Sequence, residues 1–126
     1  MTPVFSQPAR PATTGLSTRD FDRIYRAPAR RQQSQHFLVV ARPRTSWAGP
    51  TRWGVSVKAR LGTAVLRNRV KRRLREILRR AQAQLPPGWD VVVQPRTSNV
   101  ATTDFSALSR ELEALLAAAL GRNEKA

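Results

Sequence analysis

The stretch Thr63–Gln84, TAVLRNRVKRRLREILRRAQAQ, decides the fold of this chain. Wound at 100° per residue, it places its apolar side chains on one stripe of a helix: Leu66, Val70, Leu74, Ile77, Leu78, Ala81 and Leu85. Eight basic residues lie between Arg67 and Arg80, and Glu76 is the only acid among them. A merely solvated helix face usually mixes both signs of charge. The stretch therefore predicts a helix that docks on a core by one stripe and binds a polyanion with the rest.

The polar side chains of this helix divide into three groups around the stripe. Opposite it lie Asn68, Arg72, Arg75 and Arg79; one flank carries Arg69, Arg73 and Arg80, and the other carries Arg67 and Lys71. Thr63 can cap the helix, and Pro86-Pro87-Gly88 ends it.

Three segments around the helix predict strands, at residues 36–42, 52–58 and 89–94. A loop with Pro and Gly joins the first two, which suggests that they pair as an antiparallel hairpin. The third, Trp89-Asp90-Val91-Val92-Val93-Gln94, has an unbroken valine run that suits a strand buried on both faces of a sheet.

Two further helices are predicted near the ends of the chain. The first runs to about Arg26, before Pro28, with Phe21, Ile24 and Tyr25 on one side. The last covers residues 104–120, with Thr102 or Thr103 as its cap and Gly121 at its end. The order is α-β-β-α-β-α, which predicts a single α+β domain over residues 15–121 with three helices on a small sheet. Residues 1–14 are expected to be a flexible Pro-rich tail and residues 122–126 a short C-terminal tail.

The composition narrows the possible functions. The 126 residues carry a net charge of +15, which calls for a polyanionic partner. The chain has no cysteine, so zinc ribbons and disulfide scaffolds are excluded. No apolar run approaches the roughly 20 residues of a membrane span, and the N-terminus lacks the apolar centre of a signal peptide. A cytoplasmic protein with no membrane partner is expected.

No set of side chains in the sequence predicts catalysis or metal binding by the protein itself. The eight acids form no pair spaced for general acid and base work, and no metal-ligand cluster or phosphate-binding glycine loop is present. The single histidine, His36, opens a strand, where a histidine is more often structural or solvated than catalytic. Any chemistry must come from another molecule, and neither catalytic nor metal-ligating residues are assigned.

Phe21 and Tyr25 lie one helical turn apart among Arg19, Arg23 and Arg26. Such an aromatic pair usually packs into a core. Aromatic rings flanked by arginines also form stacking platforms for unpaired bases. Both interpretations stay open from the residues alone.

The segment Ala64-Val65-Leu66-Arg67-Asn68-Arg69-Val70-Lys71-Arg72-Arg73-Leu74-Arg75-Glu76 resembles the signature of the bacterial ribonuclease P protein component. The resemblance extends from about Leu16 to Leu120. It includes the D-F-x-x-x-Y stretch from Asp20 to Tyr25, the lead-in from Val55 to Gly62, and Asp90-Val91-Val92-Val93 followed by Arg96.

The resemblance implies a subunit of an endoribonuclease that removes the 5′ leader from precursor tRNA, with the active site and most of the bound Mg²⁺ in the RNA subunit. The residues expected to contact the catalytic RNA are Arg67, Asn68, Arg69, Lys71, Arg72 and Arg75. Those expected to contact the leader are Phe21, Tyr25, Lys58, Arg60 and Arg96. The implied fold is that of the second domain of ribosomal protein S5, with a left-handed β-α-β crossover.

Three other classes of protein would also be basic or act on nucleic acid. A ribosomal or other structured-RNA-binding protein would be equally basic, but it has no need of an aromatic pair facing a cleft. A DNA-binding protein would place the arginine helix in a major groove, yet no dimerisation element is visible. A self-contained nuclease is opposed by the missing acid and histidine constellation. The oligomeric state is not indicated.

Overall fold

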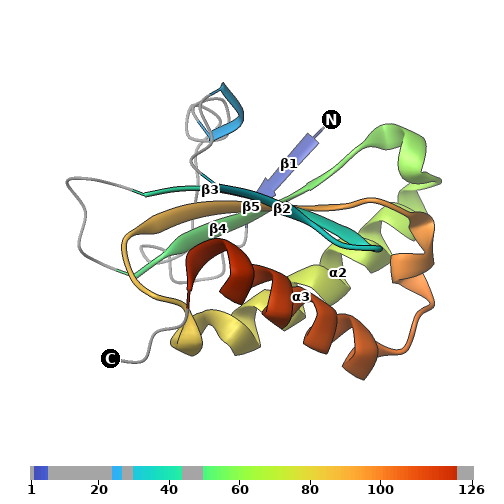
Figure 1. The fold of residues 1–126 in the computed structure, drawn as a ribbon. Helices are drawn as coiled ribbons and strands as arrows, with labels where there is room; N and C mark the ends of the chain where they lie inside the picture. Colours follow the sequence, from blue (N-terminus) through green and yellow to red (C-terminus); the bar gives the residue numbers. More distant parts are fainter. Residues whose placement is uncertain (1, 6–23, 27–29, 44–49, 122–126) are drawn as a thin grey trace.

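The computed structural model describes residues 2–5, 24–26, 30–43 and 50–121. Its strands form one five-stranded mixed sheet in the order β1-β4-β5-β3-β2 (Figure 1). The strands are β1 (Thr2–Phe5), β2 (Arg30–Gln33), β3 (Phe37–Pro43), β4 (Arg52–Val57) and β5 (Trp89–Pro95). The helices are α2 (Ala64–Ala81) and α3 (Phe105–Leu120), with short 3-10 helices η2 (Ala59–Leu61), η3 (Gln82–Gln84) and η4 (Ser98–Ala101). The predicted α+β class is confirmed.

The pairing of β3 and β4 differs from the predicted hairpin, which was wrong. Strand β5 lies between them, antiparallel to β3 and parallel to β4. The all-valine segment Val91–Val93 is buried on both faces, as predicted, and this burial favours the centre of the sheet over an edge. Because β4 and β5 are parallel neighbours, α2 forms the crossover between them. The left-handed sense of that crossover stays an expectation from the resemblance.

Two strands were not predicted. β1 pairs antiparallel with β4 and covers what would otherwise be an edge of the sheet, although its residues were assigned to a flexible tail. β2 pairs antiparallel with β3, and all four of its residues are exposed. Neither segment has the apolar alternation of a half-buried strand, so its sequence alone gave no signal.

Helix α2 matches the prediction closely. Thr63 is the N-cap, and its side-chain oxygen accepts a hydrogen bond from the Leu66 N–H at 3.2 Å. The predicted stripe faces the sheet: Leu66 and Leu85 are partly buried, and the rest are buried, namely Val70, Leu74, Ile77, Leu78 and Ala81.

Helix α3 has a different cap from the one predicted. Asp104, rather than Thr102 or Thr103, is the N-cap, and its Oδ2 accepts a bond from the Ala107 N–H at 3.0 Å. Thr103 instead donates its hydroxyl to the Asn99 carbonyl at 2.8 Å in the preceding turn. Gly121 ends the helix with a φ of 86°, as expected of a residue in the left-handed region.

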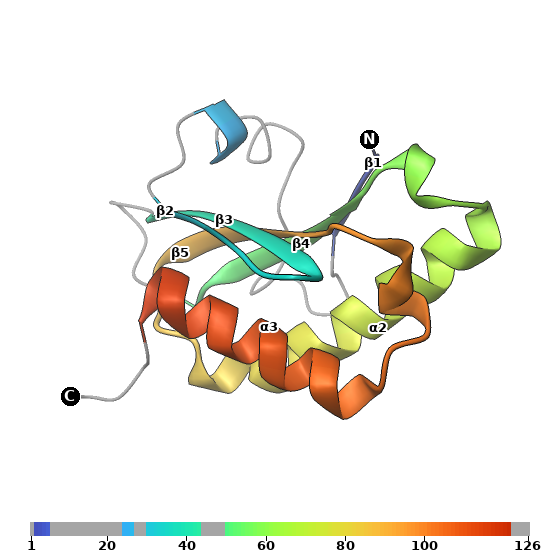
Figure 2. The ribbon, with the colours of Figure 1, turned by 45° about the vertical axis from the view of Figure 1, so that its right-hand side comes forward.

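The two faces of the sheet are covered very differently. Helices α2 and α3 lie side by side on one face, over the main core (Figures 1 and 2). The helical residues 24–26 lie on the other face, where Ile24 packs with Leu38, Val40 and Val92, and Tyr25 packs beside them. No helix within the described ranges is both long and apolar enough to cross a membrane.

Candidate RNA-binding interface

The outward face of α2 presents polar and cationic side chains, with the exposed apolar Val65 among them near the start of the helix. Asn68, Arg69 and Arg72 are exposed, and Arg67, Lys71 and Arg75 are half-buried. These are the six residues predicted to contact RNA, and the helix displays them together because its stripe is held on the core. An arginine offers a planar fork of donors suited to phosphate oxygens.

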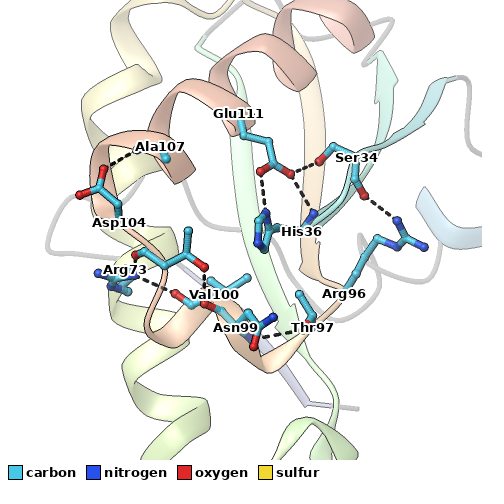
Figure 3. Close-up of polar contacts among 11 residues, drawn as sticks. Ser34, His36, Arg73, Arg96, Thr97, Asn99, Val100, Asp104, Ala107 and Glu111 are labelled. Carbon is cyan, nitrogen blue, oxygen red and sulfur yellow. Dashed lines mark hydrogen bonds and ion pairs between the residues drawn. The ribbon is translucent and has the colours of Figure 1, made fainter.

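Other arginines of the same helix are occupied within the protein. Arg73 Nη1 donates to the Val100 carbonyl at 2.9 Å (Figure 3) and to the Thr103 carbonyl at 2.6 Å. Its guanidinium also lies over the ring of Phe105. Arg79 and Arg80 both pair with Glu76, at 2.9 and 2.8 Å. The charge run therefore contains both structural arginines and arginines that remain available to a ligand.

The start of α2 is shaped by Gly62. A Cβ on this residue would collide with the Leu66 side chain, and its φ of 157° is rarely adopted by other residues. The Gly62 carbonyl accepts a bond from Arg67 Nε at 3.2 Å. The missing Cβ at Gly62 thus leaves room for the Leu66 side chain, and the backbone carbonyl of this residue holds the Arg67 guanidinium.

A pocket of about 470 Å³ lies beside η2, on the side of β3 that carries Leu38. Three of the predicted leader-binding residues, Lys58, Arg60 and Arg96, line it together, although they come from two separate parts of the chain. The remaining lining residues are Leu38, Leu61, Gln94, Pro95, Thr97 and Ser98. Cationic groups around an amphipathic pocket suit an extended polyanion that carries flat bases.

Tyr25 packs against the small apolar cluster on this face of the sheet, and Leu38 of that cluster lines the pocket. Its ring is partly buried, and burial raises the pKa of its phenol, although the Ser56 hydroxyl and the charge of Arg31 oppose this rise. The ring therefore stays neutral at physiological pH. Phe21, the other predicted aromatic residue, lies outside the described residues.

Sequence reasoning missed Gln94 and Thr97 as pocket residues. Gln94 is a buried polar side chain at the end of the valine run, and this break in the apolar pattern was the available signal. Thr97 gave no signal, since it is one of several small polar residues in a loop.

The carboxylates of the described residues are already engaged. Asp90 receives two bonds from Arg52, at 2.9 and 3.0 Å, Glu113 accepts one from Ser109, and Glu76, Asp104 and Glu111 are bonded as well. No three acidic, histidine or cysteine side chains gather into a metal-binding group in this part of the chain. This donor set does not fit a protein-held Mg²⁺ site.

Comparison with known proteins agrees with this geometry. Residues 15–120 match the family model described as Ribonuclease P. The chain belongs to the ribonuclease P protein family.

Individual relatives of the family match over most of their length. The ribonuclease P protein component of Ruegeria pomeroyi is 38% identical over 109 residues, covering 83% of this chain and 87% of the relative. The ribonuclease P protein component of Oleidesulfovibrio alaskensis is 40% identical over 91 residues, covering 66% of this chain and 73% of the relative. The solved structure of the Thermotoga maritima RNase P protein superposes with a TM-score of 0.73 at 32% identity, covering 83% of this chain and 96% of that one.

The family settles the class of activity. The chain has the role of a protein component of ribonuclease P, an RNA-binding part of an endoribonuclease that acts in tRNA processing. The ribosomal alternative is not favoured.

Proposed function

We propose that this protein binds two RNA elements on adjacent surfaces: the catalytic RNA of ribonuclease P on α2, and the 5′ leader of precursor tRNA in the pocket beside η2. The observation that carries the proposal is the convergence of Lys58, Arg60 and Arg96 on one pocket next to the exposed arginine face of α2. The short η2 segment joins the two surfaces, so one protein could hold leader and catalytic RNA near each other.

The α2 surface suits structured RNA. Helical RNA is recognised mainly through its shape and its phosphate and ribose groups, which is what arginine forks and an asparagine amide can contact. Arg67, Asn68, Arg69, Lys71, Arg72 and Arg75 would make these contacts, and the apolar stripe would keep the helix in one orientation.

The pocket suits a single strand. Lys58, Arg60 and Arg96 would track its phosphates, while the neutral ring of Tyr25, together with Phe21, would stack on unpaired bases. The protein contributes binding and orientation, because the described carboxylates are engaged in internal contacts. Mg²⁺ is proposed to be held mainly by the catalytic RNA, and the complex is proposed to act in the cytoplasm.

Reconstitution tests this proposal. Purified protein is mixed with bacterial ribonuclease P RNA and a precursor tRNA at low Mg²⁺, and release of the leader is followed on a gel. Leader removal should be faster than with RNA alone, and the protein alone should cleave nothing. No gain over RNA alone would refute the accessory role, and cleavage by protein alone would point to a self-contained nuclease.

A further inference from the structure

The carboxylate of Glu111 ties helix α3 to the turn between β2 and β3. It accepts a bond from Ser34 Oγ at 2.5 Å, one from the His36 backbone N–H at 2.8 Å, and one from His36 Nδ1 at 2.6 Å (Figure 3). Both carboxylate oxygens are used, and hydrogen bonds to a charged acceptor are stronger than neutral ones. The turn is therefore held firmly against α3.

Arg96 also makes two hydrogen bonds to the same turn. Its backbone N–H donates to the His36 carbonyl at 2.8 Å, and its Nη1 donates to the Ser34 carbonyl at 2.5 Å (Figure 3). Arg96 is itself exposed and lines the pocket. A guanidinium has five N–H donors, so the bond to Ser34 leaves donors for a phosphate oxygen.

We infer that Glu111 is a positioning residue for Arg96: it fixes the turn whose Ser34 carbonyl aims the Arg96 guanidinium at the pocket. This inference rests on the proposed leader-binding role of Arg96. A preset arginine loses less side-chain freedom when a phosphate binds, which strengthens binding without adding a contact. The turn follows β2, which is only four residues long, fully exposed and at the edge of the sheet.

The positioning role can be separated from a role in stability. The Glu111 side chain is 21% exposed, at the rim of the core. The apolar residues of α3 that hold the helix, including Leu108, Leu112 and Leu115, do not depend on its charge. Glu111→Gln keeps the shape of the side chain but removes the charge and one acceptor oxygen.

The test uses the reconstituted holoenzyme and measures the Kd of precursor tRNA and of mature tRNA. Glu111→Gln should weaken precursor binding by about threefold to tenfold and leave mature tRNA unchanged. In steady-state cleavage KM should rise while kcat stays constant. Glu113→Gln is the matched control, since this exposed α3 carboxylate accepts a bond only from Ser109 among the described residues. Equal losses for precursor and mature tRNA, or for both variants, would overturn the inference.

A double-mutant cycle decides whether Glu111 acts through Arg96. In the Arg96→Ala background, Glu111→Gln should cause no further loss of precursor affinity. Additive losses would overturn the inference. If Arg96→Ala alone has no effect, the leader role proposed for Arg96 fails; if it weakens binding and Glu111→Gln does not, only the positioning role fails. Ser34→Ala, which removes a single donor to Glu111, should give a smaller loss of the same kind and serves if Glu111→Gln does not fold.

Discussion

Helices α2 and α3 cover one face of the sheet and enclose twenty buried apolar residues, whereas the opposite face buries four among the described residues. The first face is closed by two long helices, and the second is bordered by the cationic pocket and by the short helical segment at residues 24–26. The contrast shows how a small basic protein can separate its two tasks. Among the described residues, most of the buried apolar side chains therefore belong to one face, and the cationic groups of the pocket lie toward the other.

The largest expected effect tests the contribution of each face to stability. Val39 and Val40 are adjacent in β3, point to opposite faces and are both buried. Val39→Ala should lower the free energy of unfolding by about 2–3 kcal/mol, from two lost methyl groups and a cavity that the rigid main core cannot refill. Val40→Ala should cost about 1 kcal/mol, because the small cluster can relax toward the pocket. Urea unfolding measures both, and equal losses would contradict the proposed division.

The second prediction concerns the binding face. Tyr25→Ala should reduce the preference for precursor over mature tRNA by about tenfold, the value expected from one lost stacking contact of roughly 1–3 kcal/mol. Tyr25→Phe keeps the ring and should retain the preference. Binding of labelled tRNAs to the holoenzyme provides the measurement. If Tyr25→Ala instead unfolds the domain, which circular dichroism would reveal, the ring belongs to the core and not to the binding surface.

A third prediction compares two exposed arginines of α2. Arg72→Ala should weaken binding of the catalytic RNA by up to about tenfold and reduce the slope of log affinity against log salt by about one. Arg79→Ala should have a smaller effect, because Arg79 already pairs with Glu76 at 2.9 Å. Filter binding over a salt series distinguishes the two variants. Equal effects would mean that the whole charge run binds without selection.

The smallest effect concerns pH. Glu111 lies in a partly buried position that by itself raises its pKa, but the bonds from Ser34 and His36 outweigh this and lower it below the ordinary value of 4.5. A lowered folded pKa stabilises the protein above the unfolded value, and this contribution is lost as the pH falls through the folded pKa. The stability difference between the wild-type protein and Glu111→Gln should therefore shrink as the pH falls below about 4. If the difference in the free energy of unfolding between the two proteins is the same at about pH 3.5 as at about pH 7, the prediction is contradicted.

The parts of the fold that depend on neighbouring residues could be predicted from the sequence. The stripe of α2, its Thr63 cap and the Gly121 end of α3 all follow from side chains within a few positions of one another. Strand pairing could not be predicted in the same way. Nothing in residues 36–58 reveals that β5 separates β3 from β4, because the burial that favours this arrangement appears only once both faces are covered.

In the candidate site, too, contacts between residues far apart in the chain could not be predicted from the sequence. Helical geometry alone placed Asn68, Arg72 and Arg75 opposite the apolar stripe, and the family resemblance added the other α2 residues. Lys58, Arg60 and Arg96 were also named from the resemblance, before the pocket brought them together. The support of Arg96 by Glu111 could not be predicted, since 75 residues separate Glu111 from His36 in the chain. The Asp104 cap was missed because Thr102 and Thr103 offered equally good side chains one and two positions away.

The central position of β5 has a consequence for synthesis on the ribosome. The chain emerges from its N-terminus, so β3, β4 and the apolar stripe of α2 are made before the strand that joins them into one sheet. Until residue 95 has left the exit tunnel, β3 and β4 each lack their shared neighbour and present unpaired backbone edges. The sheet can therefore be completed only late in translation, after the strongly basic helix α2 has been made.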